Sequence, residues 1–195
     1  MIRVLLVHDV GLLRSALAQR LAVETDFEVA HTPWSTAPSR ARSLGPDVCA
    51  VDLECTESYG IAPLGELCDR RLLVIAAAHR PGPLRRAVEA QALGFVDRDG
   101  TPEQLVQGIR QVARGKRFVT DSLGFGFLRA AEMPLTRREL SVLSLAAGGA
   151  SISDIAHSLH LSNGTVRNYM AAITRKTGAR NRVDAIRISR GEGWL

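Results

Sequence analysis

The sequence predicts an α/β fold, a doubly wound five-stranded parallel sheet followed by a small all-α domain of four helices. Short apolar runs alternate with helical apolar periods over residues 1–118, which is typical of a parallel sheet covered by helices on both faces. Over residues 135–195 only helical periods occur, separated by capping residues and glycines. We therefore expect an N-terminal domain at 1–118, a connector at 119–134 and a C-terminal domain at 135–195.

Uninterrupted apolar runs mark three strands of the N-terminal domain, Val4–Val7, Val48–Val51 and Leu72–Ala76, because a strand inside such a sheet buries both of its faces. Phe27–Ala30 and Gly94–Val96 are expected as further strands. Apolar residues at helical spacing between and after these runs predict five helices. The second of these helices is the least well defined, since Pro33 and Pro38 interrupt it.

Capping residues locate the four helices of the C-terminal domain. In chain order, the helices begin at Thr136, at Ser151 or Ser153, at Ser162 and at Asn181. Each of these side chains can accept a hydrogen bond from a first-turn N–H group. Gly148 ends the first helix and His160 ends the second, so only a short turn separates the second helix from the third. This spacing predicts a helix-turn-helix.

The third of these helices has the pattern of a recognition helix. Val166, Met170 and Ile173 form an apolar stripe, which leaves the opposite face free to touch a duplex. Side chains near the start of such a helix read base edges, and those near its end meet phosphates. The candidate DNA-binding residues are Asn163, Thr165, Val166, Arg167, Asn168, Arg175 and Lys176.

The net charge of the chain lies in the C-terminal domain. The whole sequence carries a formal net charge of +5 at pH 7. Nine Lys and Arg residues and four Asp and Glu residues lie from Leu135 onward, so the same +5 resides there and the rest of the chain is neutral. A basic helical domain of this kind favours double-stranded DNA as partner over a purely structural role.

Residues 135–195 resemble the LuxR-type DNA-binding domain. The matching motifs are Leu135–Glu139, Ile155–Leu159, Leu161–Asn168, Lys176–Gly178 and Arg182–Ala185. The resemblance implies that residues 152–171 form the helix-turn-helix, that Arg167 and Asn168 face base edges and that Lys176 faces the DNA backbone. It also implies that the last helix pairs two copies as a homodimer on DNA. Ser153 and Ala171 stand where some relatives carry basic residues, which implies fewer phosphate contacts.

Polar residues follow several predicted strands at the sheet edge where doubly wound folds bind ligands. Asp9 follows the first strand, Asp52 the third and Arg98 the fifth. With the runs at 45–48 and 94–99, this layout resembles the flavodoxin-like receiver domain of two-component response regulators. Over the full chain the resemblance is to NarL/FixJ-family response regulators.

The receiver resemblance implies that Asp52 is the phosphoacceptor. The other cleft positions are His8, Asp9, Ala76, Phe95 and Arg98. Three positions depart from the family pattern: His8 replaces a second carboxylate, Ala76 a Thr or Ser, and Arg98 a Lys. An imidazole weakens any Mg²⁺ site formed by Asp9 and Asp52, because Mg²⁺ prefers oxygen ligands. Ala76 cannot donate a hydrogen bond to a phosphoryl group.

These departures predict an atypical receiver in a transcriptional regulator that is not an enzyme. We expect its output to be set by dimerisation, a small-molecule ligand or a protein partner. The altered site weakens the case for a histidine kinase partner, and no cofactor is expected, with Mg²⁺ bound only if the site functions. The first strand is followed by neither a Gly-x-Gly-x-x-Gly motif nor a Walker loop.

Other interpretations stay open. Because Asp9 and Asp52 are retained, a conventional phospho-activated regulator is one alternative. A module that sequesters other regulators is a second, and a metal-binding or pH-sensing site at His8 and His79 is a weaker third. Asp52 also fits a purely structural, hydrogen-bonded carboxylate at a strand end.

Other features of the sequence predict a cytoplasmic protein with no membrane partner. No apolar run approaches the roughly twenty residues that a spanning helix needs, and the N-terminus leads directly into a strand instead of a signal peptide. Three cysteines without metal-ligand spacing fit a reducing compartment and act as core and loop fillers.

The connector residues Leu123, Phe125, Phe127 and Leu128 are too apolar for a solvated linker, so they dock on one or both domains or serve dimerisation.

Overall fold

The N-terminal domain is built on one parallel sheet. The computed structural model describes residues 1–54, 67 and 71–195. Its strands pair in the order β2-β1-β3-β4-β5-β6, all parallel. They are β1 (Ile2–Val7), β2 (Phe27–Thr32), β3 (Val48–Asp52), β4 (Leu72–Ala76), β5 (Gly94–Asp97) and β6 (Phe118–Val119). The order reverses beside β1, so the carboxyl ends of β1 and β3 lie at the switch point of the sheet.

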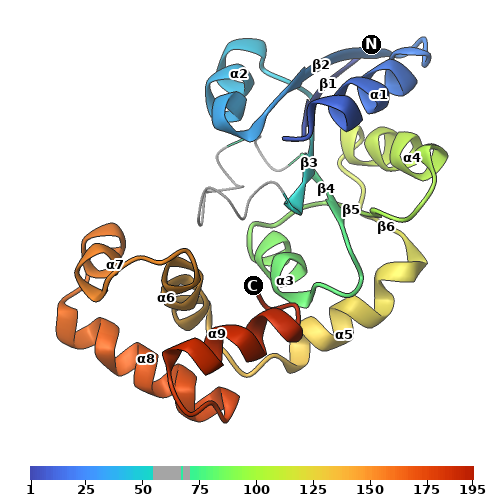
Figure 1. Cartoon of the computed structure of the whole chain (residues 1–195). Coiled ribbons are helices and arrows are strands. Elements are labelled where there is room, and N and C mark those ends of the chain that lie inside the picture. The colour runs from blue at the N-terminus through green and yellow to red at the C-terminus, as the bar shows by residue number, and fades with distance from the viewer. Residues whose placement is uncertain (55–66, 68–70) are drawn as a thin grey trace.

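Helices cover both faces of this sheet (Figure 1). The described helices of this domain are α1 (Gly11–Ala22), α2 (Ala37–Leu44), α3 (Pro81–Glu89) and α4 (Pro102–Ala113). α2 and α3 share one buried core with Leu5, Val51 and Val74, and α1 and α4 share the other with Leu6, Ala50 and Leu73. Alternate residues of each central strand thus feed opposite cores, as the uninterrupted apolar runs predict.

The structure corrects the predicted sheet in two places. A sixth strand, β6, pairs with β5, where five strands were expected. Its two residues are too few to produce a readable apolar pattern. Pro33 and Pro38 do not interrupt a helix, because Pro33 precedes a 3₁₀ turn at Trp34–Thr36 and Pro38 lies in the first turn of α2. The absent proline N–H is harmless at that position.

The C-terminal domain contains α6 (Arg137–Ala147), α7 (Ile152–Leu159), α8 (Asn163–Thr177) and α9 (Arg182–Gly191). All four begin at predicted capping residues, which are Thr136, Ser151, Ser162 and Asn181. In each case the side chain accepts a hydrogen bond from the N–H three residues on. Fully buried Leu143, Ile155, Val166 and Ile173 hold the helices together.

The connector consists of a 3₁₀ turn, Asp121–Leu123, and α5 (Gly124–Glu132). One face of this segment packs on the N-terminal domain: Leu123 is fully buried, and the Phe127 ring meets the Phe95 ring edge-on at 5.1 Å. Phe125 and Leu128 are 67% and 65% exposed, so the expectation that they dock is wrong within this chain.

Cys49 is fully buried in β3, as a core residue should be, but it is disulfide-bonded, which the sequence did not lead us to expect. The other two cysteines lie outside the described residues. Among the helices that the structure describes, none has the length and apolar character to cross a bilayer.

Candidate functional site

Asp52, at the carboxyl end of β3, is almost completely buried, and both of its carboxylate oxygens have partners. Oδ1 accepts a hydrogen bond from the Glu54 N–H at 3.0 Å. Oδ2 lies 3.0 Å from Nε2 of His8 and 3.8 Å from a guanidinium nitrogen of Arg98. The structure therefore brings His8, Asp52 and Arg98 together, with Glu54 as a fourth member that the sequence analysis missed.

The hydrogen bonds of His8 define its protonation state. The Val10 N–H donates to Nδ1 at 3.0 Å, so Nδ1 acts as an acceptor and the ring proton resides on Nε2, facing Asp52. Burial of the imidazole lowers its pKa below the ordinary value, and the opposing influence of Asp52 does not cancel this. A neutral imidazole is thus favoured beside Asp52, with its protonated Nε2 3.0 Å from the carboxylate.

Asp9, the other carboxylate predicted for this cleft, bonds the turn after β2. Its Oδ1 accepts the Trp34 N–H at 2.7 Å and so anchors the turn after β2. Within the described part of the chain, no group of three His, Cys, Asp or Glu side chains is placed to hold a metal ion. Mg²⁺ binding by Asp9 and Asp52 stays a prediction, and no chemistry is assigned to that ion.

Ala76 and Phe95 add no polar side chain to the cluster around Asp52. Ala76 ends β4, and its carbonyl accepts the Arg98 N–H at 2.9 Å, so this position organises backbone and offers no hydroxyl. Phe95 is buried against Phe127 of the connector, so this cleft position contacts the segment that leads to the C-terminal domain. His8 and His79 line two different cavities, so the structure does not support a shared metal or pH-sensing site.

α8 exposes a basic, polar face. Its N-terminus is capped by Ser162, whose Oγ accepts the Thr165 N–H at 3.0 Å. Asn163, Arg167, Asn168 and Arg175 are exposed, and over the described residues neither of these arginines has an ion pair with an acidic side chain. Val166, in contrast, is fully buried in the domain core. Its place among the predicted DNA contacts is wrong, because a residue of the apolar stripe cannot also face a duplex.

Lys176 has an intramolecular partner. Its Nζ lies 2.7 Å from Oε2 of buried Glu139, the same oxygen that accepts the Thr136 N–H at 2.6 Å. Burial alone raises the pKa of Glu139, but the bonds from Lys176 and Thr136 outweigh it and hold the pKa below its ordinary value. Lys176 therefore stabilises the cap of α6, a role that the sequence pattern did not reveal.

Comparisons with known proteins agree with this architecture. The family model described as bacterial regulatory proteins, luxR family, matches residues 133–189. The response regulator RamR of Streptomyces coelicolor is 50% identical over 100% of this chain and 98% of its own length. The chain belongs to the LuxR family of response regulators. Another relative of this regulator, DesR of Bacillus subtilis, is 35% identical over the full length of both chains.

Solved structures of the family share the fold of this LuxR-family response regulator. The RcsB–DNA complex superposes with a TM-score of 0.56 at 17% identity, covering 97% of this chain and 98% of that one. The prediction of a receiver-type sheet followed by a LuxR-type helix-turn-helix is thereby confirmed. The protein is a DNA-binding transcriptional response regulator.

Proposed function

We propose that this regulator binds double-stranded DNA as a homodimer through α8, and that its receiver signals without phosphoryl transfer to Asp52. The observation that carries the second half is the close contact between Nε2 of His8 and Oδ2 of Asp52 at 3.0 Å. A carboxylate must present an oxygen to attack a phosphoryl group, whereas Oδ1 of Asp52 already accepts the Glu54 N–H and Oδ2 already contacts His8 and Arg98.

The charge around Asp52 also supports this proposal. Phosphoryl transfer concentrates negative charge on the transferred oxygens, which cations must neutralise. Arg98 is a nearby cation, but its charge is shared between two carboxylates, since it lies 3.8 Å from Asp52 and 3.9 Å from Glu54. Replacing a carboxylate by His8 and a hydroxyl by Ala76 removes further groups that this chemistry uses.

The DNA-binding half rests on α8 and on the charge of its domain. Arg167 and Asn168 are exposed one turn into a capped helix, where a helix in the major groove reads base edges. RcsB has been solved bound to DNA, including as two dimers on two parallel DNAs. We extend that dimeric mode to this chain, with α9 as the predicted contact between copies.

The proposal is tested by intact-mass measurement after incubation with a small-molecule phosphodonor and Mg²⁺. Wild type is expected to gain no phosphoryl group and to bind DNA equally with and without the donor. His8→Asp, which restores a carboxylate, is the matched gain-of-function control. Phosphorylation of wild type with tighter DNA binding, both lost in Asp52→Ala, would establish the conventional phospho-switch instead. Very weak DNA binding by every variant would favour a sequestering module.

A cavity beside Asp52 favours a small-molecule ligand as the signal. It has a volume of about 200 Å³ and lies between α1 and α4. Leu13, Leu17 and Leu105 line its walls, and His8, Asp52 and Arg98 contribute polar groups. Apolar walls with a few convergent polar groups are typical of ligand sites. A thermal-shift screen of wild type against Arg98→Ala tests this candidate, and a ligand that stabilises both equally does not use the site.

A further inference from the structure

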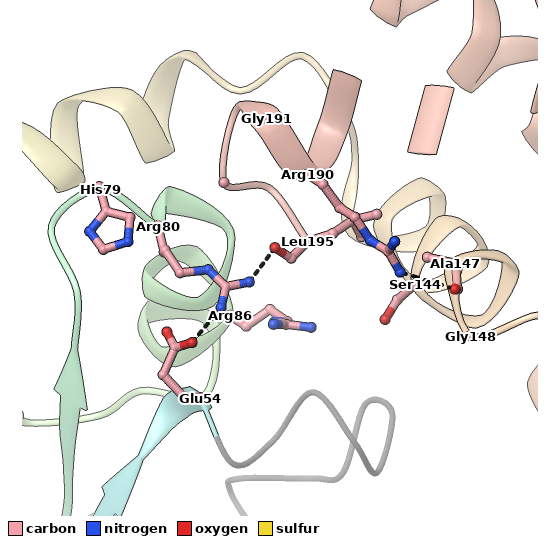
Figure 2. Close-up of a pocket in the computed structure, with 11 residues that line it drawn as sticks. Glu54, His79, Arg80, Arg86, Ser144, Ala147, Gly148, Arg190, Gly191 and Leu195 are labelled. Atoms are coloured by element: carbon pink, nitrogen blue, oxygen red, sulfur yellow. Dashed lines mark hydrogen bonds and ion pairs between the residues drawn. The ribbon is translucent and has the colours of Figure 1, made fainter. Parts of the chain in front are cut away.

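The C-terminal tail of the chain is docked on the receiver at the turn between β4 and α3. The Gly82 N–H donates to the Gly193 carbonyl at 3.0 Å. The Arg80 guanidinium donates to the main-chain oxygen of Leu195, a contact drawn in Figure 2. The end of α9 therefore lies against the receiver and not in solvent, as the position of the C-terminus beside α3 in Figure 1 also shows.

Two glycines permit this close approach. A Cβ atom on Gly82 would lie 1.9 Å from the Trp194 carbonyl oxygen, and one on Gly193 would lie 2.5 Å from the His79 carbonyl oxygen. Gly193 also has a φ of +68°, which L side chains rarely adopt. The two backbones meet so closely that any side chain at either position would separate them.

Arg80 links the tail to the cleft around Asp52. Its guanidinium pairs with the Glu54 carboxylate at 2.5 Å, and the Glu54 N–H donates to Asp52 at 3.0 Å. Arg98 lies 3.9 Å from Glu54 and 3.8 Å from Asp52, so Arg98 and Arg80 share the Glu54 carboxylate. A continuous chain of contacts thus runs from Asp52 through Glu54 and Arg80 to the tail.

The interface has the character of a reversible contact. The two domains enclose a cavity of about 530 Å³ between α3, α6 and the end of α9, lined by Glu54, Arg80, Arg86 and Arg190 (Figure 2). Further contacts are polar: Arg129 of the connector pairs with Glu192 at 2.7 Å, and Arg85 donates to the Leu135 carbonyl at 2.8 Å. Polar interdomain contacts around a cavity permit domain motion more readily than a continuous apolar interface.

The geometry points to a tether that couples the cleft to the DNA-binding domain: Glu54 and Arg80 hold the C-terminal tail, and the charge at Asp52 sets how firmly they do so. An anion bound beside Asp52 draws Arg98 toward itself and leaves the Glu54 carboxylate to Arg80, which strengthens the tether. Loss of negative charge at Asp52 shifts Arg98 onto Glu54, where it competes with Arg80 and loosens the tether.

The consequence for DNA binding rests on the proposed function. The receiver and the connector contact Gly193 and Glu192, immediately after the C-terminal end of α9, whereas Val183 near its start is 75% exposed. A second copy pairing along α9 meets the receiver at that end. Release of the tail therefore frees the whole helix for dimerisation, and the apparent DNA affinity rises with the fraction of released molecules.

Hydrogen exchange at the Gly82 amide measures the tether directly in the full-length chain. Gly82 is the second residue of α3, where an amide has no acceptor within its own helix, so its protection depends on the Gly193 carbonyl. We expect Arg80→Ala and Glu54→Gln to accelerate this exchange by the same factor, with no further gain in the double variant. Asp52→Ala is expected to accelerate it as well.

Arg42→Ala, at an exposed arginine of α2, is the matched control and should leave the exchange unchanged. Unchanged protection of amides deeper in α3 shows that each variant stays folded. Wild-type exchange in Arg80→Ala would overturn the tether, and separate, additive effects of Arg80→Ala and Glu54→Gln would overturn their coupling.

On a random-sequence duplex, Arg80→Ala should bind more tightly than Arg42→Ala, and equal affinity would overturn the release step. Absence of DNA binding in all variants would instead refute the proposed function, while the exchange result would stand.

Discussion

Replacing Lys176 by Ala separates a structural role of this residue from a role in DNA binding. The change leaves the buried carboxylate of Glu139, 6% exposed, without its cation at 2.7 Å. A hydrogen bond to a charged group contributes about 1.5 to 3 kcal/mol, and solvent screening at the 32% exposed Lys176 side chain reduces the expected loss to about 1 to 2 kcal/mol. For a domain of this size, each kcal/mol lowers the Tm by about 4 to 8 °C.

The assay is thermal unfolding of the full chain followed by Trp194 fluorescence, with Trp34→Phe in every variant. Trp194 packs against the core of the C-terminal domain, so its emission reports that domain. Arg175→Ala is the matched control, because Arg175 is the exposed neighbour on the same helix and its loss should change stability by at most about 0.5 kcal/mol. Glu139→Gln combined with Lys176→Ala should cost less than the sum of the single changes. Equal Tm values for Lys176→Ala and Arg175→Ala would refute a structural role of Lys176.

Three further predictions follow from individual residues. The pKa of Glu139 is lower in the folded protein, so its contribution to stability is present above its ordinary pKa of 4.5 and is lost as the pH falls through the lower folded value. Denaturant titrations at several pH values should therefore show a smaller loss of stability at acid pH for Glu139→Gln than for wild type. An equal loss in the two proteins would contradict this prediction. Arg167→Ala should cost about 1 to 3 kcal/mol on a selected operator and much less on a random duplex; equal losses on both would show a phosphate contact. A Cβ on Gly94 would lie 2.7 Å from the Val112 side chain, so Gly94→Ala should lower the free energy of unfolding of the receiver by about 1 to 3 kcal/mol in denaturant titrations. Gly124→Ala, which places its Cβ in open space, is the control and should leave stability unchanged. Equal stability of the two variants would contradict tight packing around Gly94.

The parts of the fold that depend on local chemistry were readable before the structure. Each helix of the C-terminal domain begins at a predicted cap, because a capping side chain bonds an amide only three residues away. The central strands β3 and β4 were found because burial on both faces demands apolar residues at nearly every position. β6 was missed because its pairing with β5 is decided by the sheet and not by its own two residues.

The candidate sites were predictable only in part, for the same reason. Asp52, His8 and Arg98 follow strands whose carboxyl ends meet at one sheet edge, so their proximity could be inferred from the strand order. That Nε2 of His8 is the nitrogen that faces Asp52 could not, since it depends on the Val10 N–H occupying the other ring nitrogen. The helical spacing of the apolar stripe in α8 already indicated that Val166 is buried, and this spacing argues against counting it among the DNA contacts.

The sequence by itself determined the two-domain order, the family and the basic character of the helix-turn-helix, because these follow from apolar periods, caps and charge along the chain. Only the tertiary structure decided which charged side chains pair. Arg80 meets Glu54 across 26 residues and the Leu195 oxygen across 115, and Lys176 meets Glu139 across 37. Partners so distant in sequence leave no local pattern, since their contact energies depend on how the domains and helices pack and not on neighbouring residues. The regulatory coupling proposed for this protein belongs to that second class.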